Sequence, residues 1–236
     1  MKTLGLIGGM SWESTASYYA WINRYVAERL GGLHSAQLLL YSVDFAPLEA
    51  MQAEGRWAEA GQVLADAGRR LEAAGAELLV LCTNTMHVVA HAMESAVSIP
   101  LLHIADPTAV AIREAGLSRV GLLGTRYTME ADFYRGRLQG VHGLEVLVPD
   151  AGDRRLVHRV IYEELCLGRI EAGSRAAYQR VVNGLAERGA QGVILGCTEI
   201  GLLLSGPDAS VPLFDTARLH AEAAAAFSLG GESTAG

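Results

Sequence analysis

Short apolar runs alternate with amphipathic stretches along most of the chain, a pattern typical of strands and helices in a parallel α/β sheet. Buried strands are expected at residues 3–9, 36–43, 78–81, 101–104, 119–124, 145–148 and 192–195. Helices are expected at residues 56–74, 107–116, 153–167, 172–188 and 217–227, and after the turns that follow the first and third strands. The segment 44–55, which contains Pro47, is expected to be an irregular loop.

The first helix has clear signals at both ends. Ser11 or Ser14 is expected to cap its start, and Gly31-Gly32 is expected to end it. Its buried stripe is expected at Tyr19, Ile22, Val26 and Leu30.

The second half of the chain repeats features of the first half. Three sets of residues recur in the same order: Gly5 and Gly8 as Gly121 and Gly124, Gly75-Ala76 as Gly189-Ala190, and residues 98–101 as residues 210–213. Three anchors in register predict two structurally related halves.

Composition narrows the function. The chain has 236 residues, half of them hydrophobic, and a net charge of −7 with scattered arginines, so a nucleic-acid or anionic-membrane surface is not expected. Three cysteines at positions 82, 166 and 197 form neither a disulfide framework nor a zinc pattern, which favours a reducing compartment. With no apolar run of about 20 residues and no signal-peptide pattern, we expect a cytoplasmic protein with a small-molecule partner.

Cofactor chemistry has little support in the sequence. The only lysine is Lys2, ahead of the first strand, so a Schiff base with pyridoxal phosphate and a Walker-type phosphate loop both lack their lysine. The first glycine turn does not have the dinucleotide-binding spacing. His87 and His91 have metal-ligand spacing but no further ligand pattern, and neither a metal nor another cofactor is expected.

Cys197 follows an apolar run at the position where parallel α/β sheets hold their ligands. It lies eight residues after Gly189, and the residue eight after Gly75 is Thr83 rather than Cys82. A shift of one residue turns a strand side chain to the opposite face. Thr83 is therefore expected to be the counterpart of Cys197, and Cys82 is expected to lie in the core.

These motifs, the Gly-Leu-Ile-Gly-Gly-Met start, Asn84-Thr85 and residues 196–199, resemble the aspartate/glutamate racemase family. The resemblance implies two related α/β domains, each a short, mostly parallel sheet flanked by helices, with a pseudo-twofold relation and an active site in the interdomain cleft. It implies a first domain of residues 1–102, completed by a final strand and helix in residues 213–236, and a second domain of residues 103–212. It also implies a homodimer.

By this resemblance the chain racemises an amino acid without pyridoxal phosphate, with L-glutamate and L-aspartate as the expected substrates and a broader range possible. Cys197 is expected to remove the Cα proton of the L-enantiomer, and Thr83 or a water it holds to act on the opposite face. The expected substrate-binding residues are Met10, Ser11, Gln52, Asn84, Thr85, Thr125, Thr198 and Glu199.

The chain departs from the family pattern in two ways that leave alternatives open. Thr83 stands where the usual first-half motif has cysteine, and residues 44–49 and 164–167 lack the arginine and the lysine that hold carboxylates in aspartate racemases. Gln52 is expected to replace part of that recognition. A related one-cysteine enzyme, such as a hydantoin racemase, maleate isomerase or arylmalonate decarboxylase, and a non-catalytic ligand-binding protein remain alternatives.

Overall fold

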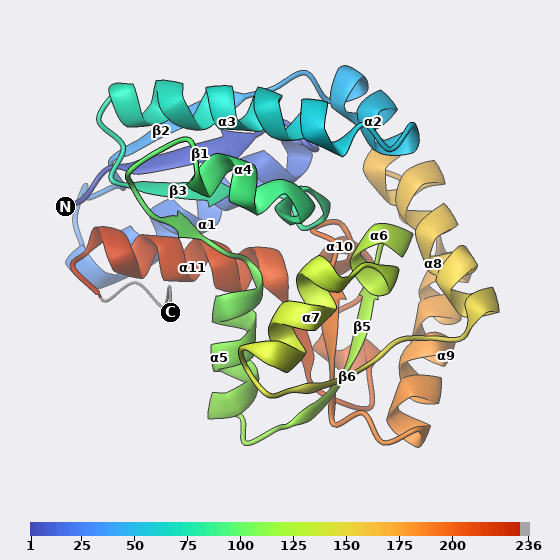
Figure 1. Ribbon diagram of the computed structural model, residues 1–236. Helices are drawn as coiled ribbons and strands as arrows, with labels where there is room; N and C mark the ends of the chain where they lie inside the picture. Colours follow the sequence, from blue (N-terminus) through green and yellow to red (C-terminus); the bar gives the residue numbers. More distant parts are fainter. Residues whose placement is uncertain (232–236) are drawn as a thin grey trace. The chain divides into compact units, whose positions relative to one another are not determined.

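The computed structural model describes residues 1–231 and divides them into two compact units (Figure 1). Among the described residues, the first unit contains residues 1–104 and 220–231, and the second contains Ala105–Leu219. The expectation for the final strand is wrong: residues 213–215 pair with a strand of the second unit, and the chain returns to the first unit only at His220. Residues 232–236 of the expected first domain lie outside the described part.

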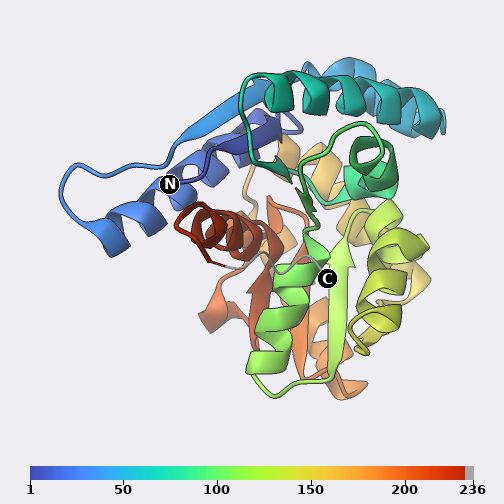
Figure 2. The same cartoon turned by 60° about the vertical axis from the view of Figure 1, so that its left-hand side comes forward.

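The first unit is a parallel sheet covered on both faces. Its strands, in the order β2-β1-β3-β4, are β1 (Leu4–Gly8), β2 (Leu38–Ser42), β3 (Leu78–Leu81) and β4 (Leu101–Leu102). Its helices are α1 (Trp12–Leu30), α2 (Phe45–Ala53), α3 (Trp57–Ala73), α4 (Ala90–Glu94) and α11 (Thr216–Ser228), whose first turn precedes the unit boundary. α3 covers one face of the sheet, and α1 and α11 lie on the other (Figures 1 and 2).

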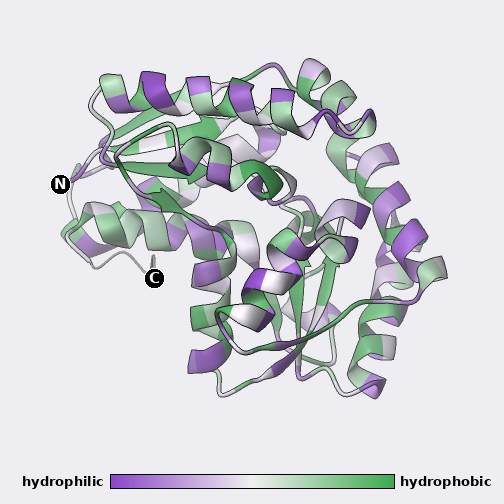
Figure 3. Cartoon of the chain, in the orientation of Figure 1, coloured by the Kyte–Doolittle hydropathy of each residue, from purple (hydrophilic) through white to green (hydrophobic). Residues whose placement is uncertain are grey.

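The second unit repeats this arrangement. Its strands, in the order β6-β5-β7-β8, are β5 (Arg119–Gly124), β6 (Glu145–Leu147), β7 (Gly192–Gly196) and β8 (Leu213–Asp215). Its helices are α5 (Ala105–Glu114), α6 (Arg126–Glu130), α7 (Asp132–Gly140), α8 (Ala151–Glu163), α9 (Ala172–Glu187) and α10 (Ile200–Leu203). Strands of both units are coloured as hydrophobic in Figure 3, while the helices alternate, as expected for parallel sheets buried under amphipathic helices.

Strand pairing confirms the internal repeat and its register. Gly5 pairs with Leu79 and Gly121 pairs with Val193, so Leu79 and Val193 are equivalent positions. Four residues further along each chain segment lie Thr83 and Cys197, the equivalence that the sequence predicts.

The repeated glycines have physical reasons. A Cβ on Gly5 would come within 2.7 Å of Ala76, and one on Gly121 within 2.8 Å of Leu185. Gly75 and Gly189 have φ values of +99° and +93°, a region that only glycine adopts easily. Each pair therefore permits the same close packing or the same turn in its unit.

Two local expectations are wrong. Residues 45–53 form α2 rather than a loop, because Asp44 caps the helix and Pro47 lies in its first turn, where the missing N–H has no helical acceptor. In α1, Tyr19 and Leu30 are 54% and 46% exposed, and the buried stripe contains Tyr18 instead.

Candidate active site

Cys197 lies directly after β7 and is 8% exposed. Its Sγ donates a hydrogen bond of 3.0 Å to Oε2 of Glu199, and Thr198 Oγ1 donates one of 2.6 Å to the same oxygen. Burial, and then the negative charge of Glu199, raise the pKa of the Cys197 thiol well above its ordinary value. Cys197 is therefore a protonated thiol, and it is hydrogen-bonded to Glu199, whose side chain can accept its proton.

Thr125 belongs to the same edge of the second sheet. Gly124 and Gly196 are register partners at the ends of β5 and β7, so Thr125 and Cys197 follow neighbouring strands. Thr125 is buried and caps α6, with its hydroxyl accepting from the N–H of Thr128 at 3.3 Å. Four of the expected site residues, Thr125, Cys197, Thr198 and Glu199, therefore lie on adjacent strand ends.

The first unit gathers the other expected residues at the corresponding edge. Ile7 pairs with Leu81, so the segments that leave β1 and β3 begin side by side. Buried residues on these segments are Met10, Ser11, Thr83, Asn84 and Thr85. Ser11 accepts from the N–H of Ser14 at 3.3 Å and caps the helix that follows β1, as Thr125 caps the helix that follows β5.

Gln52 reaches this group from α2. Its side chain is buried, and its Nε2 lies 3.1 Å from Sδ of Met86, the residue after Thr85. The helix that the sequence did not predict therefore directs Gln52 toward the turn that contains Thr83.

The carbonyl of Thr83 is held by a histidine. Nδ1 of His87 lies 2.8 Å from this oxygen, while the N–H of Thr83 donates to the carbonyl of Leu81 at 2.8 Å. His91 is exposed and lies 3.4 Å from Ser95 Oγ. Within residues 1–231 no three His, Cys, Asp or Glu side chains are grouped as metal ligands. His87 instead contacts the backbone of Thr83.

Sequence reasoning missed this role because the residue types on a helical turn do not reveal which carbonyl they face. The available signal was the interval of four residues from Thr83 to His87, which brings side chain and carbonyl together on a helical turn.

Cys82 is a core residue, as predicted. It is fully buried, its Sγ faces the carbonyl of Val80 at 3.7 Å, and burial raises the pKa of its thiol. Cys166 is only half-buried and packs against the cluster that contains Cys197. Lys2 lies at the start of β1, the end away from Gly8, with its Nζ 4.0 Å from the ring centroid of Phe227.

A family model described as Asp/Glu/Hydantoin racemase matches residues 7–224 of the chain. The chain belongs to this racemase family. A putative Asp/Glu racemase from Yersinia pestis has a similar structure, with a TM-score of 0.92 and 59% identity over 97% of this chain and 100% of that one. An aspartate racemase homologue from Pyrococcus horikoshii OT3 gives a TM-score of 0.84 and 35% identity over 97% of this chain and 100% of that one.

One curated relative is named for broad specificity toward amino acids. The broad specificity amino-acid racemase RacX of Bacillus subtilis (strain 168) is 24% identical over 90% of this chain and 92% of its own length. Membership of the racemase family and these relatives support an amino-acid racemase, which is an isomerase. No helix among residues 1–231 is both long enough and apolar enough to cross a membrane.

Proposed function

We propose that this racemase interconverts the enantiomers of a dicarboxylic amino acid, L-glutamate or L-aspartate, without pyridoxal phosphate. The observation that carries the proposal is the strand register, which makes Thr83 the equivalent of Cys197. Racemisation needs one group to remove the Cα proton and another to return a proton to the opposite face. The proposal requires the two strand ends to serve the same amino acid.

Cys197 acts on the L-enantiomer with help from Glu199. The thiol first transfers its proton along the 3.0 Å hydrogen bond to the Glu199 carboxylate, giving a thiolate and a neutral carboxylic acid. The thiolate then takes the Cα proton, and the electron pair of the C–H bond passes into the substrate carboxylate as an enediolate. Donors such as Asn84 and Thr85 stabilise this developing charge.

Thr83 supplies the opposite face. A hydroxyl is a far weaker base than a thiolate, so Thr83 acts by delivering a proton, directly or from a water that it holds. The alkoxide or hydroxide left behind takes a proton from solvent, and Glu199 releases its proton to solvent, so both groups return to their starting states. In the reverse direction the D-enantiomer must lose its proton on this weaker side, while the Cys197 thiol donates. We therefore expect Cα–H exchange to be faster from the L-enantiomer than from the D-enantiomer.

Two residues favour a dicarboxylic substrate. Gln52 offers a neutral amide beside the Thr83 turn, and Arg126 is an exposed cation two residues beyond β5, whose guanidinium donates to the Tyr127 hydroxyl at 3.1 Å. Arg126 has no acidic partner within 4 Å among residues 1–231. We expect Arg126→Gln to raise the KM for L-glutamate about tenfold and to leave that for L-alanine unchanged; equal effects on both would contradict a carboxylate-binding role.

The direct test is solvent exchange. Purified protein is incubated in D₂O with L-glutamate or D-glutamate, without added pyridoxal phosphate, and both Cα deuteration and chirality are followed. Deuterium entering L-glutamate faster than D-glutamate supports the proposal. Equal rates contradict the asymmetry, and the absence of exchange with glutamate, aspartate and a panel of other amino acids contradicts the racemase proposal.

A one-cysteine reaction is the second candidate, favoured by the protonated state of Cys197 and the lack of a thiol at position 83. A single thiol that donates to an enediolate is the requirement of an arylmalonate decarboxylase-like reaction. Carbon dioxide release from an arylmalonate, without racemisation of amino acids, would identify it.

We also propose that the chain acts as a homodimer and needs no cofactor. A dimer predicts twice the chain mass in light scattering coupled to gel filtration. Activity that survives dialysis against a chelator and treatment with hydroxylamine would support the second point, because these remove metals and pyridoxal phosphate.

A further inference from the structure

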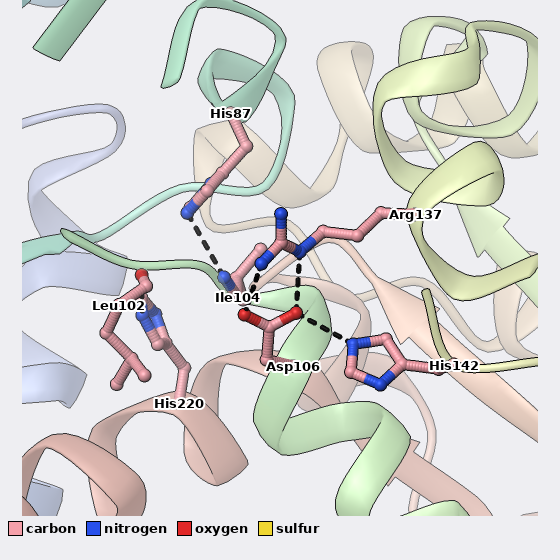
Figure 4. A network of polar contacts seen from close by, with 7 residues as sticks. All are labelled: His87, Leu102, Ile104, Asp106, Arg137, His142 and His220. Carbon is pink, nitrogen blue, oxygen red and sulfur yellow. Dashed lines mark hydrogen bonds and ion pairs between the residues drawn. The ribbon is translucent and has the colours of Figure 1, made fainter. Parts of the chain in front are cut away.

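The contacts of His87 determine which of its ring nitrogens carries the proton. The backbone N–H of Ile104 donates to Nε2 at 3.2 Å, so Nε2 is an acceptor. Nδ1, 2.8 Å from the carbonyl oxygen of Thr83, must then be the donor, because a carbonyl only accepts. Because Nε2 accepts and Nδ1 donates, the buried His87 ring is neutral and bridges two backbone groups, of which Figure 4 shows the contact with Ile104.

One end of this bridge is the turn that contains Thr83. The N–H of Thr83 is bonded to the Leu81 carbonyl, and its own carbonyl is bonded to His87, so the rotations on both sides of its Cα are restrained. The direction of the Thr83 hydroxyl follows from that backbone. A reacting group that is misplaced by about 1 Å can lose about 100-fold in rate.

The other end of the bridge is the segment by which the chain leaves the first unit. Ile104 is the last residue of that unit before the crossing, and Leu102, two residues earlier, accepts a 2.9 Å hydrogen bond from Nε2 of His220. His220 is the first residue of the same unit after the chain returns. Two buried histidines thus hold residues 102–104 from both sides (Figure 4).

The second unit has no histidine at the equivalent place. The register that relates Thr83 to Cys197 relates His87 to Gly201, and the carbonyl of Cys197 accepts instead from the backbone N–H of Ile200 at 3.1 Å. The side-chain bridge is therefore specific to the Thr83 turn.

We propose that His87 is a positioning residue for Thr83: through its Nδ1–H it holds the Thr83 carbonyl, and through Nε2 it fixes that turn to the exit segment at Ile104. The inference rests on the proposed racemisation. It makes His87 necessary for proton transfer on the face that Thr83 serves, and dispensable for transfer by Cys197.

Two substitutions separate the two contacts. In His87→Asn the amide nitrogen lies near the former Nδ1 and can still donate to Thr83, whereas in His87→Gln the amide oxygen lies near the former Nε2 and can still accept from Ile104. His91→Gln is the matched control, because His91 is exposed one turn along the same segment. For each variant, kcat and KM for Cα–H exchange are measured from D-glutamate and from L-glutamate in D₂O, together with the melting temperature.

We expect His87→Gln to lower kcat for exchange from D-glutamate about 10- to 100-fold and to leave exchange from L-glutamate within about twofold, whereas His87→Asn retains most of the D-glutamate rate. Nitrogen-15 NMR of the wild-type protein should show His87 as the Nδ1–H tautomer. An unchanged D-glutamate rate in His87→Gln, equal losses from both enantiomers, or the Nε2–H tautomer would overturn the positioning role. If wild-type protein exchanges neither enantiomer, the proposed function fails and the positioning role fails with it; exchange in the wild type that His87→Gln leaves intact overturns the positioning role alone.

Discussion

The turn after β3 and the turn after β7 occupy equivalent positions, yet they are held and equipped differently. The Thr83 carbonyl is bound by the His87 side chain, whereas the Cys197 carbonyl is bound by the backbone N–H of Ile200. At Gly201, the equivalent of His87, a Cβ would come within 2.7 Å of Asp215 Oδ2. In the second unit Gly201 therefore leaves room for the Asp215 side chain, whereas in the first unit His87 at the equivalent position binds the Thr83 carbonyl.

Under the proposed mechanism, this difference divides proton transfer between the two units. In the second unit the titratable pair, Cys197 and Glu199, lies on the turn itself. In the first unit the turn carries the hydroxyl and amide groups of residues 83–85, and the titratable side chain, His87, binds the backbone of the turn. The two units share their backbone geometry, while the side chains at the two strand ends differ.

The largest expected effect is on Cys197, because of the two equivalent positions 83 and 197 only the second carries a thiol. Cys197→Ser should lower exchange from L-glutamate by at least about 1,000-fold, since a hydroxyl is a poor replacement for a thiolate base. Cys82→Ser is the control: it should cost about 1–3 kcal/mol of stability, because it buries a hydroxyl in the core, and retain activity below its melting temperature. The reverse result would mean that the register points to the wrong strand face.

Glu199 is the next test of the division of work. Its negative charge contributes to the raised pKa of the Cys197 thiol, so Glu199→Gln should lower that pKa and speed alkylation by iodoacetamide at pH 7. Racemisation should nevertheless fall about 100-fold, because the acceptor for the thiol proton is lost. Glu187→Gln, at an exposed position in α9, is the control. An unchanged alkylation rate would show that Glu199 does not affect the reactivity of the Cys197 thiol.

Features of the fold could be predicted from the sequence where neighbouring residues in the chain determine them. The register was predictable, because Gly5, Gly121, Gly75 and Gly189 each meet a local steric need that recurs in both units. The helix α2 was not, because Pro47 in a first turn resembles proline in a loop. The preference for Tyr18 over Tyr19 in the core depends on a distant partner, since the Tyr18 hydroxyl lies 2.9 Å from Nδ1 of His220.

The candidate site shows the same limit. Residues on strand ends could be assigned, because parallel strands bring their carboxyl ends to one edge. The support from His87 and the proton-accepting contact of Glu199 depend on which atoms side chains face, which spacing alone does not fix. The prediction that β8 belongs to the first unit was wrong, because it came from family resemblance, whereas the strand pairs with β7 of the second unit.

A substitution that makes the two turns chemically equal should give a smaller but positive effect. Thr83→Cys places a thiol at both strand ends, so exchange from D-glutamate should rise about tenfold toward the rate from L-glutamate, since a thiol is the better proton-transfer group. Thr83→Ser keeps a hydroxyl and should leave the ratio of the two rates near that of the wild type. A D-glutamate rate that does not respond to Thr83→Cys would show that another group serves this face.

The last expected effect is on stability rather than on rate, and it concerns how each unit holds its polar core. In the second unit Asp106, 1% exposed, receives Arg137 at 2.6 and 2.7 Å and His142 at 2.8 Å (Figure 4). In the first unit His220 is neutral, because burial lowers its pKa to about 3, and the Tyr18 hydroxyl donates to its Nδ1. The expected response of the first unit to acid therefore rests on His220.

The sign of the His220 effect follows from its lowered pKa. Unfolding restores a pKa of about 6.5, so below that pH the unfolded chain binds the proton that the folded chain refuses. Stability should therefore fall as pH drops from about 6.5 toward 3, by up to about 1.4 kcal/mol per pH unit, and level off below the folded pKa. His220→Gln, which retains an amide donor for the Leu102 carbonyl, should remove this part of the slope in urea unfolding between pH 7 and 5. A slope equal to that of the wild type would place the acid sensitivity elsewhere, and the Asp106 cluster of the second unit would then be the next group to test.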